Sequence, residues 1–234
     1  MWILLSYSIV FVLDIDDVRN LTREDQFVEY VGAALFLMAS VAFFLLYKRS
    51  RQISMFTKIS FRGNIFYLLL GLAFLFVCLE EISWGQRLIG FQTPEGIRDI
   101  NAQSEFNLHN LNIFHGATES GERKGFWGLL LNMDRLFAIF WLSYCCLIPV
   151  LCRISPPTRA LLDRIRLPIV PIFVGALFIA NYAATKILEM VVATEFHHAI
   201  VEIKEANSGM LFLVVALWFL RTDRYPATEN PGAV

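Results

Sequence analysis

Long apolar runs constrain this chain more than any other feature of its sequence. Four of them, at residues 27–47, 65–84, 126–152 and 167–192, approach or exceed the length of a membrane-crossing helix, which is about 20 residues. A fifth run, at residues 210–220, reaches that length if its helix begins near Thr194. Residues 1–13 are also apolar but stop at Asp14, so we expect a short or tilted span there. The sequence therefore predicts an all-α polytopic membrane helix bundle with about six spans, or five if the first segment does not cross.

The composition agrees with this class. Of the 234 residues, 56% are hydrophobic, whereas soluble domains are roughly 45 to 50% apolar. No repeat or linker divides the chain, so we expect a single integral membrane domain over residues 1–234, with residues 85–125 as an extracytoplasmic insertion at the interface. The net charge of −1 gives no support for nucleic-acid binding. The four cysteines lie inside apolar runs without zinc or redox spacing, which predicts buried small apolar side chains.

The distribution of Lys and Arg predicts the orientation. Basic residues gather in three short segments, at residues 48–62, 153–166 and 221–224. Short basic loops stay in the cytoplasm, and alternating crossings put all three segments on one side of the membrane. We therefore expect a protein of the cytoplasmic (inner) membrane with both termini in the cytoplasm. Its acidic segments then face outward.

Two adjacent carboxylates, Glu80 and Glu81, close the third apolar run. Carboxylates at this depth are costly unless they are paired or hydrated. If the helix continues past Gly85, Arg87 shares a face with Glu80 and is its nearest candidate partner. The doubled glutamate favours a functional role over a simple interfacial anchor.

Two short helices are expected in the outer insertion. Thr93-Pro94-Glu95 is typical of a helix start. A second helix, beginning near Ser104, would be amphipathic or re-entrant and would align four polar residues on one face. These are Asn101, Glu105, His109 and Asn112. Because this stripe holds His and Glu rather than Lys and Arg, it indicates a protein cavity and not an anionic-lipid anchor.

The sharpest polar row lies before the last apolar run. It consists of Glu195, His198, Glu202 and Glu205, whose 3, 4, 3 spacing falls within an arc of roughly 80° on a helix. Glu195 and His198 have the i, i+3 spacing of carboxylate-bridged metal sites. The candidate ligands for a divalent metal (Zn, Fe or Mn) are therefore Glu105, His109, Glu195, His198 and Glu202. The candidate catalytic residues are Glu80, Glu81 and Glu202.

Two resemblances accompany these residues. The strings EEISWGQR, from Glu80, and NAQSEFNLHN, from Asn101, resemble a signature of uncharacterised bacterial multipass membrane proteins, a likeness that covers about one eighth of the chain and implies no activity. A second likeness is to ceramidase-like membrane hydrolases, whose zinc site combines three His with Asp and Ser among seven helices. The chain offers His109, His115, His197 and His198 but no HxxxH pair, so this likeness is an analogy.

Three functions stay open on the sequence alone. The first is a metal-dependent hydrolase or transferase acting on a lipid or lipid-linked substrate at the outer leaflet. The second is a transporter or proton-coupled permease whose path is lined by Glu80, Glu81, Asp134 and Glu189. The third is a non-catalytic scaffold or sensor in which these groups hold helices together. In each case membrane lipids are the expected partners.

Overall fold

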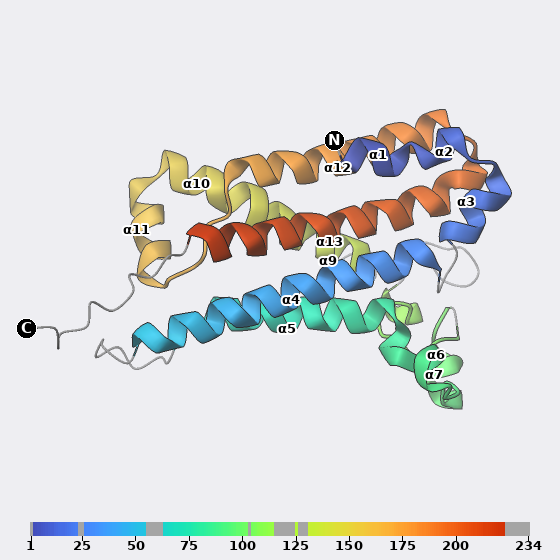
Figure 1. Cartoon of the computed structure of the whole chain (residues 1–234), viewed down its shortest axis with the longest axis horizontal. Coiled ribbons are helices and arrows are strands. Elements are labelled where there is room, and N and C mark those ends of the chain that lie inside the picture. Colours follow the sequence, from blue (N-terminus) through green and yellow to red (C-terminus); the bar gives the residue numbers. More distant parts are fainter. Residues whose placement is uncertain are drawn as a thin grey trace, which may run out of the picture.

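The protein is an antiparallel bundle of long helices, shown as a computed structural model in Figure 1. The structure describes residues 2–22, 26–54, 63–102, 104–114, 125 and 131–222. Within these ranges the regular elements are helices, without a named strand. Four helices are long and apolar enough to cross a membrane, and a fifth span results if α5 is joined to the bent segment after it. The predicted all-α polytopic class is confirmed.

The crossing helices follow the predicted runs closely. Four are single helices: α4 (Phe27–Ser54), α5 (Ile65–Glu81), α12 (Ile172–Val191) and α13 (His197–Thr222). The other is a continuous unit of three elements, α9 (Met133–Trp141), η3 (Leu142–Leu147) and α10 (Ile148–Ile154). α13 does extend back close to Thr194, through the short η4 (Thr194–Phe196). The unit containing α9 begins at Met133, with Asn132 as its N-cap. The predicted run starts at residue 126, but Asn132 and Asp134 lie at the start of α9.

The first apolar segment forms a half-length helix. It comprises α1 (Trp2–Tyr7) and α2 (Ile9–Val12), and α3 (Ile15–Thr22) follows. Figure 1 shows α1 beginning about midway along α12. The segment from Trp2 to Val12 extends only about 16 Å at the helical rise per residue, roughly half of the hydrocarbon core. The structure thus favours five spans over six.

A polar network fastens this half-length helix to the bundle. The Tyr7 hydroxyl donates to Asn181 Oδ1 at 2.9 Å, and Asn207 Nδ2 donates to Ser6 Oγ at 2.9 Å. Asn207 Nδ2 also donates to Asn181 Oδ1 at 3.1 Å. Buried polar groups inside a membrane need such partners, so α1 is held specifically between α12 and α13.

Aromatic side chains fill the middle of the bundle. Phe74 packs on Phe212 with ring centroids 4.5 Å apart and on Phe43 at 5.6 Å. Tyr67 and Phe219 continue the packing toward the basic end, with centroids 5.9 Å apart. Such rings interlock by edge and offset contacts. The centre of the bundle is therefore a closed apolar core.

The two ends of the bundle differ in charge, as predicted. The basic segments share one end, where Arg49 Nη1 donates to the carbonyl of Leu220 at 3.3 Å and Asn64 Nδ2 donates to the carbonyl of Arg166 at 2.8 Å. This end carries α11 (Pro156–Arg164). The opposite end carries α3, α6 (Gln86–Ile89) and α7 (Glu95–Arg98), as Figure 1 shows. The basic residues Lys58, Arg62 and Arg224 lie outside the described ranges.

The outer insertion is only partly helical. The predicted helix near Thr93 is present as α7, which begins at Glu95. The prediction of a helix from Ser104 is wrong. Ser104 has φ 60°, and turns follow it. A bridge joins Asn101 to Leu111, and η2 (Asn112–Phe114) comes next. A left-handed residue interrupts helical hydrogen bonding, so the i, i+4 spacing of Glu105 and His109 does not place them on one helical face.

Candidate functional site

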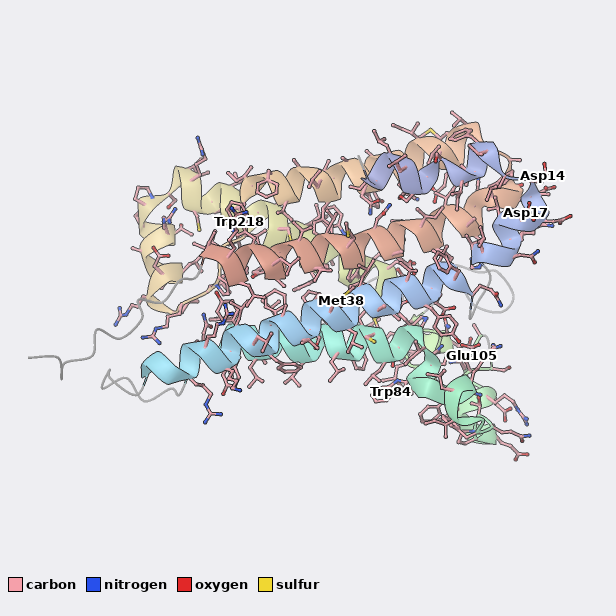
Figure 2. All side chains as sticks on the ribbon, viewed as in Figure 1. Asp14, Asp17, Met38, Trp84, Glu105 and Trp218 are labelled. Atoms are coloured by element: carbon pink, nitrogen blue, oxygen red, sulfur yellow. The ribbon has the colours of Figure 1, made fainter. Side chains whose placement is uncertain are left out.

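The site begins where α5 breaks. Ser83, Trp84 and Gly85 have φ values of 45°, 54° and 75°, and the chain turns by 67° into the next helical segment. Two successive non-glycine residues at positive φ are uncommon and are kept only where surrounding contacts hold them. Here the turn folds Trp84 back so that its Nε1 donates to Glu80 Oε1 at 2.5 Å. Figure 2 shows Trp84 and Glu105 in this bent corner.

Glu80 is a buried anchor for the loop that carries His109. Its exposed fraction is only 4%. Its Oε2 accepts the backbone N–H groups of Leu108 at 2.7 Å and His109 at 2.8 Å, and lies 3.3 Å from His109 Nδ1. With the bond from Trp84, these donors offset the cost of burying a carboxylate. Glu80 therefore fixes both the backbone and the ring of His109.

Arg87 does not pair with Glu80 as predicted, but with Glu105. Its Nη2 lies 2.7 Å from Glu105 Oε1. The other oxygen of Glu105 accepts from Ser83 Oγ at 2.5 Å and from Asn107 Nδ2 at 3.2 Å. Since α5 ends before Arg87, the continuous face assumed from the sequence does not exist. Glu105 is a buried structural group of the loop.

Further bonds complete this scaffold. Gln86 Nε2 donates to Thr93 Oγ1 at 2.8 Å, and Gln86 Oε1 accepts from the backbone N–H of Phe106 at 2.8 Å. Asn101 Nδ2 donates to Asn107 Oδ1 at 2.9 Å. The polar residues of the two signature strings thus hold one compact corner at the end of α5. Their spacing in the sequence reflects this shared network.

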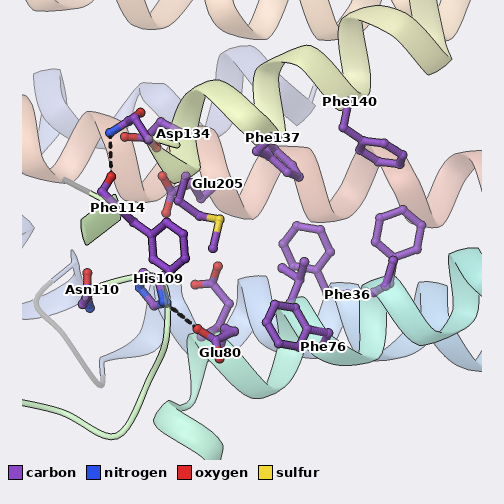
Figure 3. Close-up of a pocket in the computed structure, with 16 residues that line it drawn as sticks. Phe36, Phe76, Glu80, His109, Asn110, Phe114, Asp134, Phe137, Phe140 and Glu205 are labelled. Carbon is purple, nitrogen blue, oxygen red and sulfur yellow. Dashed lines mark hydrogen bonds and ion pairs between the residues drawn. The ribbon is translucent and has the colours of Figure 1, made fainter. Parts of the chain in front are cut away.

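An amphipathic cavity of about 320 Å³ lies beside this corner. Its deep wall is apolar and comes from α4, α5 and α9, whereas its outer end is polar (Figure 3). The apolar lining residues are Phe36, Ala73, Phe74, Phe76, Val77, Phe114, Met133, Phe137 and Phe140. The polar ones are Glu80, Glu81, His109, Asn110, Asn132, Asp134 and Glu205. This volume is at the lower end of the usual range for small-molecule sites.

The cavity reaches the lipid-facing side of α5. Ala73 and Phe76 line it and are also exposed on the helix surface. Leu69 and Leu72 are exposed nearby on the same helix. Exposed apolar side chains on a crossing helix face acyl chains. A ligand could thus reach the cavity sideways from the bilayer.

Only one residue of the predicted row from Glu195 to Glu205 lines the cavity. Glu205 lines it, whereas Glu195, His198 and Glu202 are not among its lining residues. His198 Nδ1 lies 3.7 Å from Glu202 Oε1, and Glu195 is exposed in η4. The structure therefore brings together Glu80, Glu81 and His109 from the predicted site and leaves Glu195, His198 and Glu202 outside the cavity.

Glu81 lies among several other carboxylates. Its electrostatic neighbours are the carboxylates of Glu205, Glu202, Glu29 and Glu80. Glu205 shares the ammonium of Lys204 with Asp134, because Lys204 Nζ lies 3.3 Å from Glu205 Oε1 and 3.9 Å from Asp134 Oδ1. Glu205 belongs to the predicted polar row and Asp134 to the predicted transport path, but neither was predicted as a catalytic or metal-binding residue. Their positions at the acidic end of the bundle were the signal that could have added them.

The candidate metal ligands do not assemble into one site. Among the described residues, no group of three or more His, Cys, Asp or Glu side chains is arranged to hold a metal ion. Glu105 is occupied by the loop scaffold, and His109 lies beside Glu80. His115 lies outside the described residues. The divalent metal expected from the sequence therefore stays a prediction.

A second cavity of about 230 Å³ lies on the other side of α9. It is lined by Asp134, which also lines the first cavity, and by Glu189. Its lining also includes the basic residues Arg135, Lys186 and Lys204. Two of the four residues predicted for a transport path, Glu80 and Glu81, therefore line the first cavity only, and Glu189 lines the second only.

Comparison with known proteins identifies no family for this chain. No protein-family model matches it, and neither a curated protein nor a solved structure is significantly similar to it. Both resemblances drawn from the sequence thus stay predictions.

Proposed function

We propose that this chain is a membrane-embedded hydrolase or transferase that binds a lipid or lipid-linked substrate in the amphipathic cavity and uses His109 as its general base. One observation carries the proposal: the pair of Glu80 and His109 lies at the polar end of a cavity whose remaining wall is largely apolar. An acid–base pair at the junction of polar and apolar surface suits a substrate with a reactive head and an apolar tail.

The pair has the arrangement of a carboxylate-oriented imidazole. A carboxylate that accepts from Nδ1–H selects the tautomer whose Nε2 holds a lone pair. A water or a substrate hydroxyl then attacks an ester or phosphoester through its oxygen, and His109 Nε2 takes the proton that this oxygen loses. The imidazolium returns that proton to the departing oxygen, so the residue ends as it began. Glu80 is a positioning residue in this scheme, because the four N–H groups that face its carboxylate hold it beside Nδ1 of the His109 ring.

Purified protein in nanodiscs, incubated with a total membrane lipid extract, tests the proposal. Mass spectrometry of the lipids should show one class consumed and its hydrolysis or transfer product formed. The isosteric His109→Asn should abolish the conversion, a loss of at least about 100-fold for a general base. His198→Asn is the matched control, since His198 is an exposed imidazole outside the cavity. Full conversion by His109→Asn would refute the proposal.

A transporter is the weaker candidate. Its path would have to pass the aromatic core formed by Phe43, Phe74 and Phe212, whose ring contacts close the middle of the bundle. The titratable residues that line the first cavity, Glu80, Glu81, His109, Asp134 and Glu205, all lie at the acidic end. A relay of protons needs closely spaced groups along its whole length. The described residues supply such groups at the two ends but not through this core.

A further inference from the structure

The charges that line the cavity point to the class of headgroup it takes. Among its described lining residues are four carboxylates, those of Glu80, Glu81, Asp134 and Glu205, and neither Lys nor Arg. The neighbouring cavity across α9 differs, because Arg135, Lys186 and Lys204 line it beside its two carboxylates. The acidic lining is thus particular to the first cavity and is not a general property of this end of the bundle.

One of these carboxylates, Glu80, is balanced inside the protein, and the other three are balanced only in part. Glu80 accepts from Trp84, Leu108 and His109. Lys204 is a single ammonium shared between Glu205, at 3.3 Å, and Asp134, at 3.9 Å. Glu81 has further carboxylates, including Glu202 and Glu29, as electrostatic neighbours. Where dielectric screening is weak, such an excess of like charge strongly favours a bound cation.

The walls limit what that cation can be. A cavity of about 320 Å³ has room for roughly ten groups of water size, which corresponds to a headgroup and the first part of a chain. Phe114 and Phe137 line the same space (Figure 3), and aromatic faces attract ammonium groups within about 6 Å. A bare metal ion gains nothing from these apolar walls, whereas an alkylammonium group uses both kinds of surface.

We propose that the cavity selects amphiphiles whose headgroup carries a protonated amine, with Glu81 and Glu205 as the residues that bind the ammonium. This inference rests on the proposed function for the reaction that follows, but binding can be measured without turnover. The amine would lie at the acidic end, next to His109, and its chain would leave past Ala73 and Phe76 toward the lipid. The carboxylates therefore supply the selectivity for the amine, and burial of the apolar chain supplies most of the affinity.

The test compares amphiphiles of equal chain length on the protein in zwitterionic nanodiscs. Dodecylamine, dodecanol and dodecyl sulfate are titrated, and binding is followed by native mass spectrometry together with the thermal unfolding midpoint. Dodecylamine should bind at least about tenfold more tightly than the other two, as expected when one partly buried ion pair is gained. Equal binding of the amine and the alcohol by the unsubstituted protein would overturn the inference.

Substitutions assign the effect to the cavity. Glu81→Gln and Glu205→Gln, made separately, should each reduce dodecylamine affinity about tenfold and leave dodecanol binding as it was. Glu189→Gln is the control, since Glu189 lies at the second cavity and pairs with Lys186 at 2.6 Å. Unchanged amine affinity in both cavity variants contradicts the assignment. Retained folding is checked by the unfolding midpoint of each variant without ligand.

His109→Asn separates this inference from the proposed function. The variant should bind dodecylamine as tightly as the unsubstituted protein while lipid conversion is lost. If the His109→Asn variant still converts lipid and the protein prefers dodecylamine, the proposed base is wrong and the headgroup assignment stands. If conversion is lost but the amine is not preferred, the headgroup assignment alone is wrong.

Discussion

At the scale of single residues, the carboxylate of Glu80 decides the geometry of the site. It is 4% exposed, and it joins the end of α5 to the backbone of Leu108 and His109 at 2.7 and 2.8 Å. The sequence could predict that a carboxylate at this depth needs partners. It could not predict which partners, because they depend on the turn at Ser83 and Trp84. Because of the same turn, Arg87 forms its ion pair with Glu105 and not with Glu80.

Replacing Glu80 with Gln should loosen the loop that holds His109. The amide has one acceptor oxygen and a donating NH2 group, so at least one of the N–H donors facing Glu80 loses its acceptor. Leaving a buried donor unsatisfied costs about 1 to 3 kcal/mol. Hydrogen exchange of the peptide containing Leu108 and His109 should therefore become about 10-fold to 100-fold faster.

Glu95→Gln provides the comparison for this measurement. The Glu95 side chain is 89% exposed and lies on α7 in the same outer insertion. It should leave the exchange of the peptide with Leu108 and His109 unchanged. Exchange that is equally slow in the Glu80 variant would show that the anchor does not hold this loop.

At the scale of elements, the helices could be predicted from hydropathy, but their breaks and rotations could not. The runs at residues 27–47 and 65–84 correspond to α4 and α5. The break after Glu81 depends on side chains more than twenty positions away, such as Glu105, which bonds to Ser83. Of the predicted row from Glu195 to Glu205, only Glu205 lines the cavity. The depth and rotation of α13 against α5 decide this, and neither is encoded in a local pattern.

The contact between α12 and the π-helical turn η3 supplies a prediction at this scale. A Cβ added at Gly175 would lie 2.3 Å from the carbonyl oxygen of Cys145 and 3.1 Å from Cys146 Sγ. Gly175→Ala should therefore push the two helices apart, at a cost of about 1 to 3 kcal/mol for overpacking. The thermal unfolding midpoint in nanodiscs should fall by several degrees.

Gly96→Ala controls for the substitution itself, because nothing lies within 4 Å of the added Cβ there. Its midpoint should match that of the unsubstituted protein. If Gly175→Ala is tolerated equally well, α12 and η3 do not pack as closely as the structure describes.

At the scale of the whole molecule, the segregation of charge was the most predictable feature. Successive spans reverse direction, so basic segments separated by two spans return to the same end. The contact of Arg49 with Leu220 bears this out. The sequence did not predict that the first segment would cover only half of the bundle. Its length allowed a tilted crossing, and the contacts of Ser6 and Tyr7 with α12 and α13 decided against it.

The proposed orientation can be tested by cysteine labelling in intact cells. Gly96→Cys and Arg164→Cys place single exposed thiols at the acidic and basic ends, whereas three native cysteines are buried and Cys146 is half-buried. A membrane-impermeant maleimide should label Gly96→Cys directly and Arg164→Cys only after permeabilisation. The opposite pattern would place the cavity on the cytoplasmic side. The unsubstituted protein reports background labelling.

The central claim, that His109 faces a cavity able to hold an amphiphile, is tested most directly by chemical modification of the individual histidines. Diethylpyrocarbonate modifies accessible neutral imidazoles, and mass spectrometry reports each histidine separately. His109 lines the cavity, and the exposed His198 does not. In nanodiscs, a neutral long-chain methyl ketone should slow the modification of His109 several-fold and leave that of His198 unchanged. Equal rates at His109 with and without the ketone would contradict the account.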